Sequence, residues 1–406
     1  QNLGSIRFYK KGIGEFVKNP DLKTRLLEAT NKVVPSLESY QDFLQDFAKK
    51  GGETDWRIGK EQFKLKLVHE LQTGVAADEL LRLAELEMVT VTHEMYVIAR
   101  QLWSGLYPGK VLPVPDVKGK NETIAKVLEK LSEKRGNPQD LLKDTRSTVK
   151  KIQSFITEKN ILTLPQPDRC QILEMPEFQR GNSVAYLNQA PPLDTNASSV
   201  YAISPPPSDW DANTVLSFMK EYNSYMLQIL TIHEAYPGHY VQLEYSNKHP
   251  SKIRRVLSSG VFAEGWAVYT EKMMLDEGYG DQDSGLRIHQ LKWYLRAVAN
   301  AVLDYQMHCN NMTDEQALDL LVNRAFQTKG EALGKIIRSK QSSCQLSTYF
   351  AGAVFFNNLR SDAQNAKGET FNLKQYHEAV LSHGTLPLNL LRDLVWVDLG
   401  LEKRVK

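Results

Sequence analysis

The sequence predicts a mostly α-helical fold with one small antiparallel β element. Apolar residues recur at alternating spacings of three and four through most of the chain, as in amphipathic helices. One proline-rich stretch, residues 164–209, interrupts the pattern and holds short runs of β-forming residues. The chain has 406 residues, of which 42% are apolar, so its core needs no disulfide support. We divide it into a helical part over residues 1–160, the proline-rich segment over 161–210 and a second helical part over 211–406.

The clearest helix of the first part is predicted over residues 77–103, with Asp78 as an N-cap or first-turn acid. Its apolar stripe consists of Leu81, Ala84, Met88, Val91, Met95, Ile98 and Leu102. Residues 108–119 contain three prolines and two glycines and predict a loop. Further helices are expected over 122–134 and 138–158.

In the proline-rich segment, short strands are predicted over residues 171–173, 183–187 and 199–203. After residue 211 the helical spacing returns in two apolar stripes. The first stripe is Val215, Met219, Tyr222, Met226, Ile229 and His233, and the second, in a helix over 252–276, is Leu257, Val261, Glu264, Val268 and Leu275. Each stripe thus carries one polar residue that is typical of metal sites.

Composition excludes several function classes. The chain has 50 basic and 48 acidic side chains, so its balance argues against a nucleic-acid scaffold. Cys170, Cys309 and Cys344 form no CxxC pair, which argues against a disulfide framework or a thiolate metal site. No apolar run approaches the roughly 18 residues of a membrane span, and no signal peptide is visible. Since the chain starts at Gln1, we expect a processed product or a fragment, whose N-terminus does not reveal its localisation.

The nine histidines were searched for metal-ligand spacing. A zinc-peptidase helix requires HExxH, because positions i and i+4 place both imidazoles on one face. None of the four His-Glu dipeptides fits: those at His69, His93, His233 and His377 are followed at i+4 by Thr73, Val97, Pro237 and Leu381. His69 and His93 are therefore interpreted as ordinary helical histidines.

Two segments have a second histidine at i+6, namely 233–239 (HEAYPGH) and 377–383 (HEAVLSH). Six residues of straight helix turn about 600°, so the two rings would point about 120° apart. In the first segment Pro237 and Gly238 allow a break that swings His239 back beside His233. The second segment has no such residues, and we interpret it as a decoy for metal binding.

A third ligand is predicted at Glu264, in the helix that follows. A carboxylate on an apolar face is costly unless it is paired, hydrogen-bonded or metal-bound. Two alternatives stay open: Glu264 in a buried ion pair with Arg or Lys, and His233 as an ordinary core histidine. Two imidazoles and one carboxylate, with a fourth position open for water, suit catalytic Zn²⁺.

The strings 231–242 (TIHEAYPGHYVQ) and 262–271 (FAEGWAVYTE) resemble the bacterial family known as domain of unknown function 885 (DUF885), which is grouped with zinc metallopeptidases. The resemblance extends over about residues 56–395 and implies a multi-helix zinc-peptidase-like fold with a central cleft. Its members are often longer at the N-terminus, with an export signal. The resemblance thus implies a periplasmic or extracellular protein and is compatible with a lipid anchor on the full-length protein. Several relatives have a second histidine where this chain has Tyr240; we keep His239 as the ligand.

The resemblance implies a zinc peptidase with His233, His239 and Glu264 as ligands and Glu234 as the general base acting on a metal-activated water. Tyr349 is the candidate oxyanion donor, because related peptidases use a tyrosine or histidine late in the chain. The candidates for contacting substrate are His377 and His383. Those for orienting a ligand imidazole are Asp304 and His308.

The expected partner is a peptide substrate. The strand over 199–203 could hold it by strand addition, whereas Trp266 and Tyr269 are expected to be packing residues. The cations available to bind a substrate carboxylate are Arg296, Arg324, Arg338 and Lys340. The sequence does not distinguish among them. Two other functions stay open: a metal-dependent hydrolase of non-peptide amides, and an inactive peptidase-like protein that binds peptides.

Overall fold

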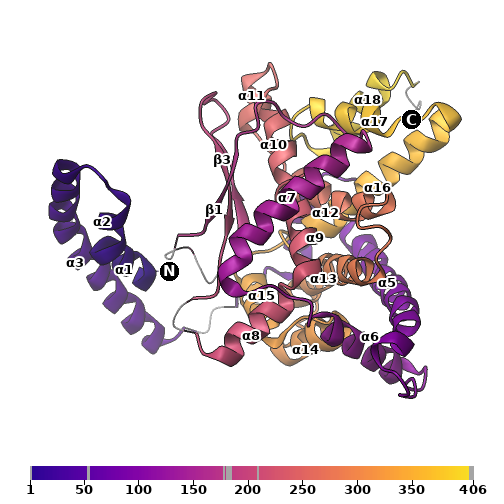
Figure 1. Cartoon of the computed structure of the whole chain (residues 1–406), viewed down its shortest axis with the longest axis horizontal. Coiled ribbons are helices and arrows are strands. Elements are labelled where there is room, and N and C mark those ends of the chain that lie inside the picture. Colours follow the sequence, from indigo (N-terminus) through magenta and orange to yellow (C-terminus); the bar gives the residue numbers. More distant parts are fainter. Residues whose placement is uncertain (1, 53–54, 177–178, 180–184, 208–209, 402–406) are drawn as a thin grey trace.

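The computed structural model describes residues 2–52, 55–176, 179, 185–207 and 210–401, and it is mostly helical, as predicted (Figure 1). In the first half of the chain the elements are α1 (Asn2–Arg7), η1 (Phe8–Gly12), α2 (Ile13–Phe16), α3 (Pro20–Lys50), α4 (Gly59–Leu71), α5 (Ala77–Leu106), α6 (Val117–Leu131), η2 (Pro138–Asp140), α7 (Leu141–Glu158), β1 (Cys170–Glu174), β2 (Ala185–Asn188) and β3 (Ser199–Ile203). In the second half they are α8 (Ala212–Glu221), α9 (Ser224–Glu234), α10 (His239–Asn247), α11 (Lys252–Val256), α12 (Gly260–Asp276), α13 (Ser284–Cys309), α14 (Asp314–Asp319), η4 (Leu320–Arg324), α15 (Lys329–Gln341), α16 (Thr348–Lys367), η5 (Gly368–Thr370), α17 (Leu373–Ser382) and α18 (Leu388–Asp398).

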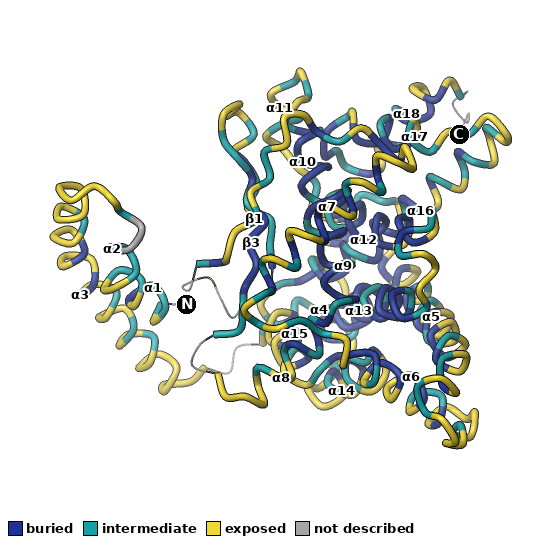
Figure 2. The backbone as a smooth tube through the Cα atoms, in the orientation of Figure 1, coloured by how far each residue is buried: buried dark blue, intermediate teal, exposed yellow. Residues whose placement is uncertain are grey.

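Helices α1 to α3 form an arm that projects from the body of the molecule (Figure 1). Most of the arm is exposed (Figure 2), and in α3 the buried residues are Thr30 and Val34. The core lies in the body, where α5, α9, α12, α13 and α16 pack against one another. The stripe predicted for α5 is confirmed at its centre, where Ala84, Met88, Val91 and Met95 are buried.

The backbones of α12 and α16 touch where Gly265 meets Gly352. A Cβ added at Gly265 would lie 2.4 Å from the Cα of Gly352, and one at Gly352 would lie 2.3 Å from the carbonyl oxygen of Val261. Side chains at either position would push the helices apart. This contact fixes α12 directly beside Glu264, one of the predicted metal ligands.

Two of the predicted helices are each broken into two. Between α8 and α9 the side chain of Asn223 accepts hydrogen bonds from the backbone N–H groups of Tyr225 and Met226, so it caps a new helix. The helix expected over 252–276 is divided into α11 and α12, and Leu257 between them is exposed. There the N–H of Ser259 donates to the carbonyl of Thr385, a distant partner that periodicity cannot reveal.

The three strands lie close to their predicted positions, but the sheet is mixed rather than antiparallel. Its order is β1-β3-β2, with β1 parallel and β2 antiparallel to β3. Alternation in sequence marks a strand but does not fix its direction. Here the chain reverses into β2 and reverses again into β3, so β3 runs parallel to β1. Because β3 is paired on both sides, the prediction that residues 199–203 receive a substrate strand is wrong. Residues 183 and 184 of the second predicted strand lie outside the described residues.

The remaining structural predictions concern cysteines and the membrane. Cys170, Cys309 and Cys344 are free thiols. Among the described residues, every helix is too short or too polar to cross a bilayer.

Candidate metal centre

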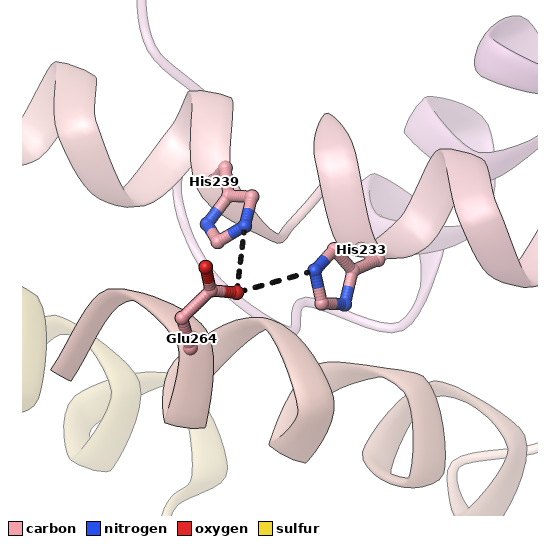
Figure 3. A group of neighbouring side chains, drawn as sticks. All are labelled: His233, His239 and Glu264. Atoms are coloured by element: carbon pink, nitrogen blue, oxygen red, sulfur yellow. Dashed lines mark ion pairs between the residues drawn. The ribbon is translucent and has the colours of Figure 1, made fainter. Parts of the chain in front are cut away.

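Three residues from three helices meet at one point. His233 is in the last turn of α9, His239 begins α10, and Glu264 lies in the second turn of α12. Glu264 Oε2 is 3.6 Å from His233 Nε2 and 3.5 Å from His239 Nε2, and Figure 3 shows both rings directed at the carboxylate. One ligand atom from each residue lies within 4.8 Å of the others. The sequence-predicted ligand set is thus brought together.

The break between α9 and α10 produces this geometry. Helix α9 ends at Glu234, and the chain turns through Pro237 before α10 starts. The N–H of Gly238 donates to the carbonyl of Ile232, and the Trp266 indole donates to the carbonyl of Pro237. A Cβ at Gly238 would lie 1.9 Å from the carbonyl oxygen of His233, so only glycine fits.

The cluster fits a tetrahedral metal ion. At Zn–N and Zn–O distances near 2.0–2.1 Å, neighbouring ligand atoms of a tetrahedron lie about 3.3 Å apart. The carboxylate–imidazole separations of 3.5 and 3.6 Å are close to this value. Within the described part of the chain, His233 and His239 are the ion-pair partners of Glu264, which does not match the alternative of a buried pair with Arg or Lys.

The charges of the cluster favour a bound cation. Burial lowers the pKa of His233, but hydrogen bonds to Glu264 and Glu271 outweigh this effect and raise it to about 10. Burial raises the pKa of Glu264, but His233 and His239 outweigh it and hold that pKa below its usual value. The Glu264 carboxylate therefore carries a negative charge that either a proton on the histidines or a metal ion must balance.

Glu271 is a site residue that the sequence analysis missed. It is fully buried in α12, and its Oε1 is 2.6 Å from Nδ1 of His233. A carboxylate in this position fixes the ring and directs Nε2 toward Glu264. It lies seven residues after Glu264, on the same face of α12, and a second acid on that apolar face was the available signal.

The residues predicted for this orienting role lie elsewhere. Asp304 accepts hydrogen bonds from the backbone N–H groups of Cys344 and Ser347. His308 Nε2 lies 2.9 Å from the carbonyl oxygen of Ser339. Asp304 thus joins α13 to the segment before α16 and His308 joins α13 to α15, so the prediction that Asp304 or His308 orients a ligand imidazole is wrong.

Glu234, the predicted base, stands beside the cluster. Its Oε2 accepts a hydrogen bond of 3.2 Å from the backbone N–H of Leu187 in β2. Burial raises the pKa of Glu234, and the two histidines lower it by less. A carboxyl whose pKa is raised toward neutrality is a better proton acceptor and donor than an exposed one.

A cavity of about 960 Å³ meets the cluster at His233. His233, Glu234, Trp293 and Tyr349 are among the residues that line it. The hydroxyl of Tyr349 accepts a hydrogen bond of 3.2 Å from Arg338, and burial raises its pKa to about 12. Tyr349 therefore stays protonated at neutral pH and has a proton to donate into the cavity.

The two histidines of the second segment do not reach this cavity. His377 is fully buried, with Nδ1 2.9 Å from the carbonyl oxygen of Ile161 and Nε2 2.8 Å from the Tyr269 hydroxyl. His383 lies 2.8 Å from Asp398. The structure therefore contradicts their predicted substrate contacts, because His377 within α17 and His383 at its C-cap have partners away from the cavity.

The aromatic residues near the ligands are packing residues, as predicted. Trp266 and Tyr269 are buried in the core. Tyr240 donates its hydroxyl hydrogen to Asp168 and accepts from the N–H of Arg169. It points away from Glu264, so His239 remains the ligand candidate.

The chain was compared with known proteins. The family model described as bacterial protein of unknown function (DUF885) matches residues 4–395. A solved structure of a candidate lipoprotein of unknown function from Shewanella oneidensis is 32% identical with a TM-score of 0.79, over 97% of this chain and 71% of that chain. A candidate lipoprotein from Colwellia psychrerythraea has a TM-score of 0.80 at 19% identity, over 97% of this chain and 66% of that one, and shows the shared fold. No curated protein matches the sequence.

Proposed function

We propose that this chain, which belongs to the DUF885 family of bacterial proteins, is a zinc-dependent hydrolase that cleaves peptide bonds. The observation that carries the proposal is the convergence of His233, His239 and Glu264 beside a cavity that also holds Glu234 and Tyr349. Two imidazoles and one carboxylate form the ligand set of catalytic rather than structural zinc. A metal ion held there supplies Lewis-acid polarisation of a carbonyl and lowers the pKa of water.

Glu234 is the proton carrier of the proposed reaction. Its carboxylate takes the proton of the attacking water and passes it to the leaving amine. The hydrogen bond from Leu187 holds one of its oxygens, so the carboxylate is oriented before substrate arrives.

Tyr349 is the proposed donor to the oxyanion. Its hydroxyl is protonated at neutral pH, lines the same cavity as Glu234 and is held by Arg338. A hydrogen bond that strengthens as negative charge develops on the carbonyl oxygen stabilises the transition state.

We also propose that the protein is exported. Two solved structures of the same fold are described as candidate lipoproteins. A peptidase in the periplasm or on the cell surface would meet peptides from outside the cytoplasm.

The test is Glu234→Gln, assayed for zinc and for hydrolysis of a broad peptide library. The variant should keep its zinc and lose about 10²–10⁴-fold in kcat, the usual contribution of a general base. The matched control is Glu378→Gln, the equivalent position of the second segment, where the carboxylate accepts from the N–H of Thr163; it should keep full activity. Unchanged turnover in Glu234→Gln would refute the assignment. A zinc-loaded wild type that cleaves only small non-peptide amides, or binds peptides without cleaving them, would favour the corresponding alternative function.

A further inference from the structure

Three cationic side chains line the cavity beside the metal cluster: Arg296, Lys335 and Arg338. Arg296 is already neutralised, since its Nη1 lies 3.0 Å from Glu331 and 4.0 Å from Glu221. Its guanidinium also stacks over Trp293. The charge of Arg296 is therefore already balanced by acidic residues in the cavity wall.

Lys335 is different, because in the described part of the chain no acidic oxygen lies within ion-pair distance of its ammonium group. Within the described residues, no hydrogen bond or ion pair joins its Nζ to another group. The side chain is half-buried, and burial, then Arg296 and Arg338, lower its pKa to about 7 against the opposing effect of Glu331 and Glu264. A half-buried ammonium that no carboxylate pairs directly costs free energy that an anion entering the cavity would offset.

Arg338 lies one turn further along α15, on the same face as Lys335. Its Nη2 donates to Oε1 of Gln345 at 2.7 Å and to the Tyr349 hydroxyl at 3.2 Å. Both acceptors are neutral, and among the described residues no carboxylate pairs with this exposed guanidinium. One face of α15 thus presents a lysine amine and a guanidinium next to the proposed oxyanion donor.

The other cations considered from the sequence do not share this position. Lys340 is 2.7 Å from Asp314, and neither Lys340 nor Arg324 lines the cavity. The structure therefore selects Arg338 from the four candidates and adds Lys335, which the sequence analysis did not consider.

We propose that Lys335 and Arg338 bind a carboxylate of the substrate, so that the enzyme selects peptides carrying a carboxylate near the scissile bond. This inference rests on the proposed hydrolase function of the adjacent site. The carboxylate can come from the peptide C-terminus, which would make the enzyme a carboxypeptidase, or from an acidic side chain. Both sources offer the oxygen pair that an ammonium and a guanidinium recognise by charge-assisted hydrogen bonds.

The experiment compares three peptides of otherwise identical sequence: a free C-terminal acid, its C-terminal amide, and the amide with one Gln replaced by Glu. Each is assayed with wild type, Lys335→Met and the control Lys340→Met, a lysine of the same helix outside the cavity. Wild type and Lys340→Met should favour one of the two carboxylate peptides over the plain amide by at least about tenfold in kcat/KM. Lys335→Met should lose that preference while keeping its zinc and its melting temperature.

Binding is measured separately by calorimetry, with the same peptides and the zinc-loaded Glu234→Gln variant with and without Lys335→Met. A carboxylate peptide should bind at least about tenfold tighter than the amide, and Lys335→Met should remove the difference. Equal binding and equal turnover of all three peptides, or a preference that survives Lys335→Met, would overturn the inference and leave the hydrolase function intact. Carboxylate-selective binding without hydrolysis by wild type would support the inference and contradict the hydrolase function.

Discussion

The chain contains the same arrangement of histidine and glutamate twice, and folds it in two ways. Residues 233–239 and 377–383 both read His-Glu-Ala followed, six positions after the first histidine, by another histidine. In the first segment both imidazoles face Glu264 at 3.5–3.6 Å. In the second, His377 is bonded inside the core and His383 contacts Asp398. Residue types at a given spacing therefore do not define the site.

The difference lies in the residues between the histidines. Pro237 and Gly238 end α9, and His239 starts a new helix that approaches α12 from another direction. Val380, Leu381 and Ser382 continue α17 without interruption up to its C-cap at His383, so His377 and His383 point to different surroundings. Two histidines six residues apart diverge on a straight helix. The backbone break between His233 and His239 brings their rings together, as a metal site requires.

The largest effect should come from adding a side chain at Gly238, within that break. Gly238→Ala places a Cβ 1.9 Å from the carbonyl oxygen of His233, so His233 and His239 must move apart. We expect zinc binding to fall below detection, measured by elemental analysis after gel filtration. The control is Ser382→Ala, the equivalent position of the second segment, which should keep its zinc. Full zinc occupancy in Gly238→Ala would show that zinc binding does not require the close approach of Gly238 to the carbonyl oxygen of His233.

A smaller loss is expected when the support of one ligand is removed. Glu271→Gln replaces the carboxylate 2.6 Å from His233 Nδ1 with a neutral amide. Zinc affinity should fall by about 10–100-fold, as is usual for partners of ligand histidines, in a chelator competition assay.

The matched change in the second segment is Tyr269→Phe, which removes the hydroxyl 2.8 Å from His377 Nε2. It should leave zinc affinity unchanged and cost about 1 kcal/mol of stability. If Glu271→Gln and Tyr269→Phe lost zinc equally, His233 and His377 would not differ in function as we describe.

Much of the site could be predicted because the ligands are adjacent to strong local signals. Pro237 and Gly238 mark the break in sequence, and the apolar spacing around Glu264 places it on the buried face of α12. The features that the sequence could not predict depend on contacts between residues far apart in the chain. The hydrogen bond from Ser259 to Thr385 holds the residue that precedes α12, and the parallel pairing of β1 with β3 makes the sheet mixed. Similarly, only the fold shows that Glu271 reaches His233 and that Asp304 does not.

The smallest expected effect is on stability and concerns the second segment. Burial lowers the pKa of His377 to about 3, so the folded protein keeps this ring neutral while the unfolded chain protonates it near pH 6.5. Its contribution to stability is present above pH 6.5 and is lost as pH falls toward 3, by at most about 1.4 kcal/mol per pH unit. We expect the free energy of unfolding, measured with urea at pH 7 and pH 5, to fall less in His377→Gln than in wild type.

The control for this measurement is the exposed His69. His69→Gln should show the same loss between pH 7 and pH 5 as wild type. An unchanged pH dependence in His377→Gln would mean that the buried ring is not the source of the acid sensitivity.

The central claim is that the broken segment, and not its unbroken counterpart, holds a metal. The most direct measurement is the zinc content of purified wild type, His239→Ala and His383→Ala after reconstitution with zinc, with circular dichroism to confirm folding. The account predicts about one zinc per chain in wild type and His383→Ala, and none in His239→Ala. A folded wild type that takes up no zinc, or a His239→Ala variant that keeps it, would contradict the account.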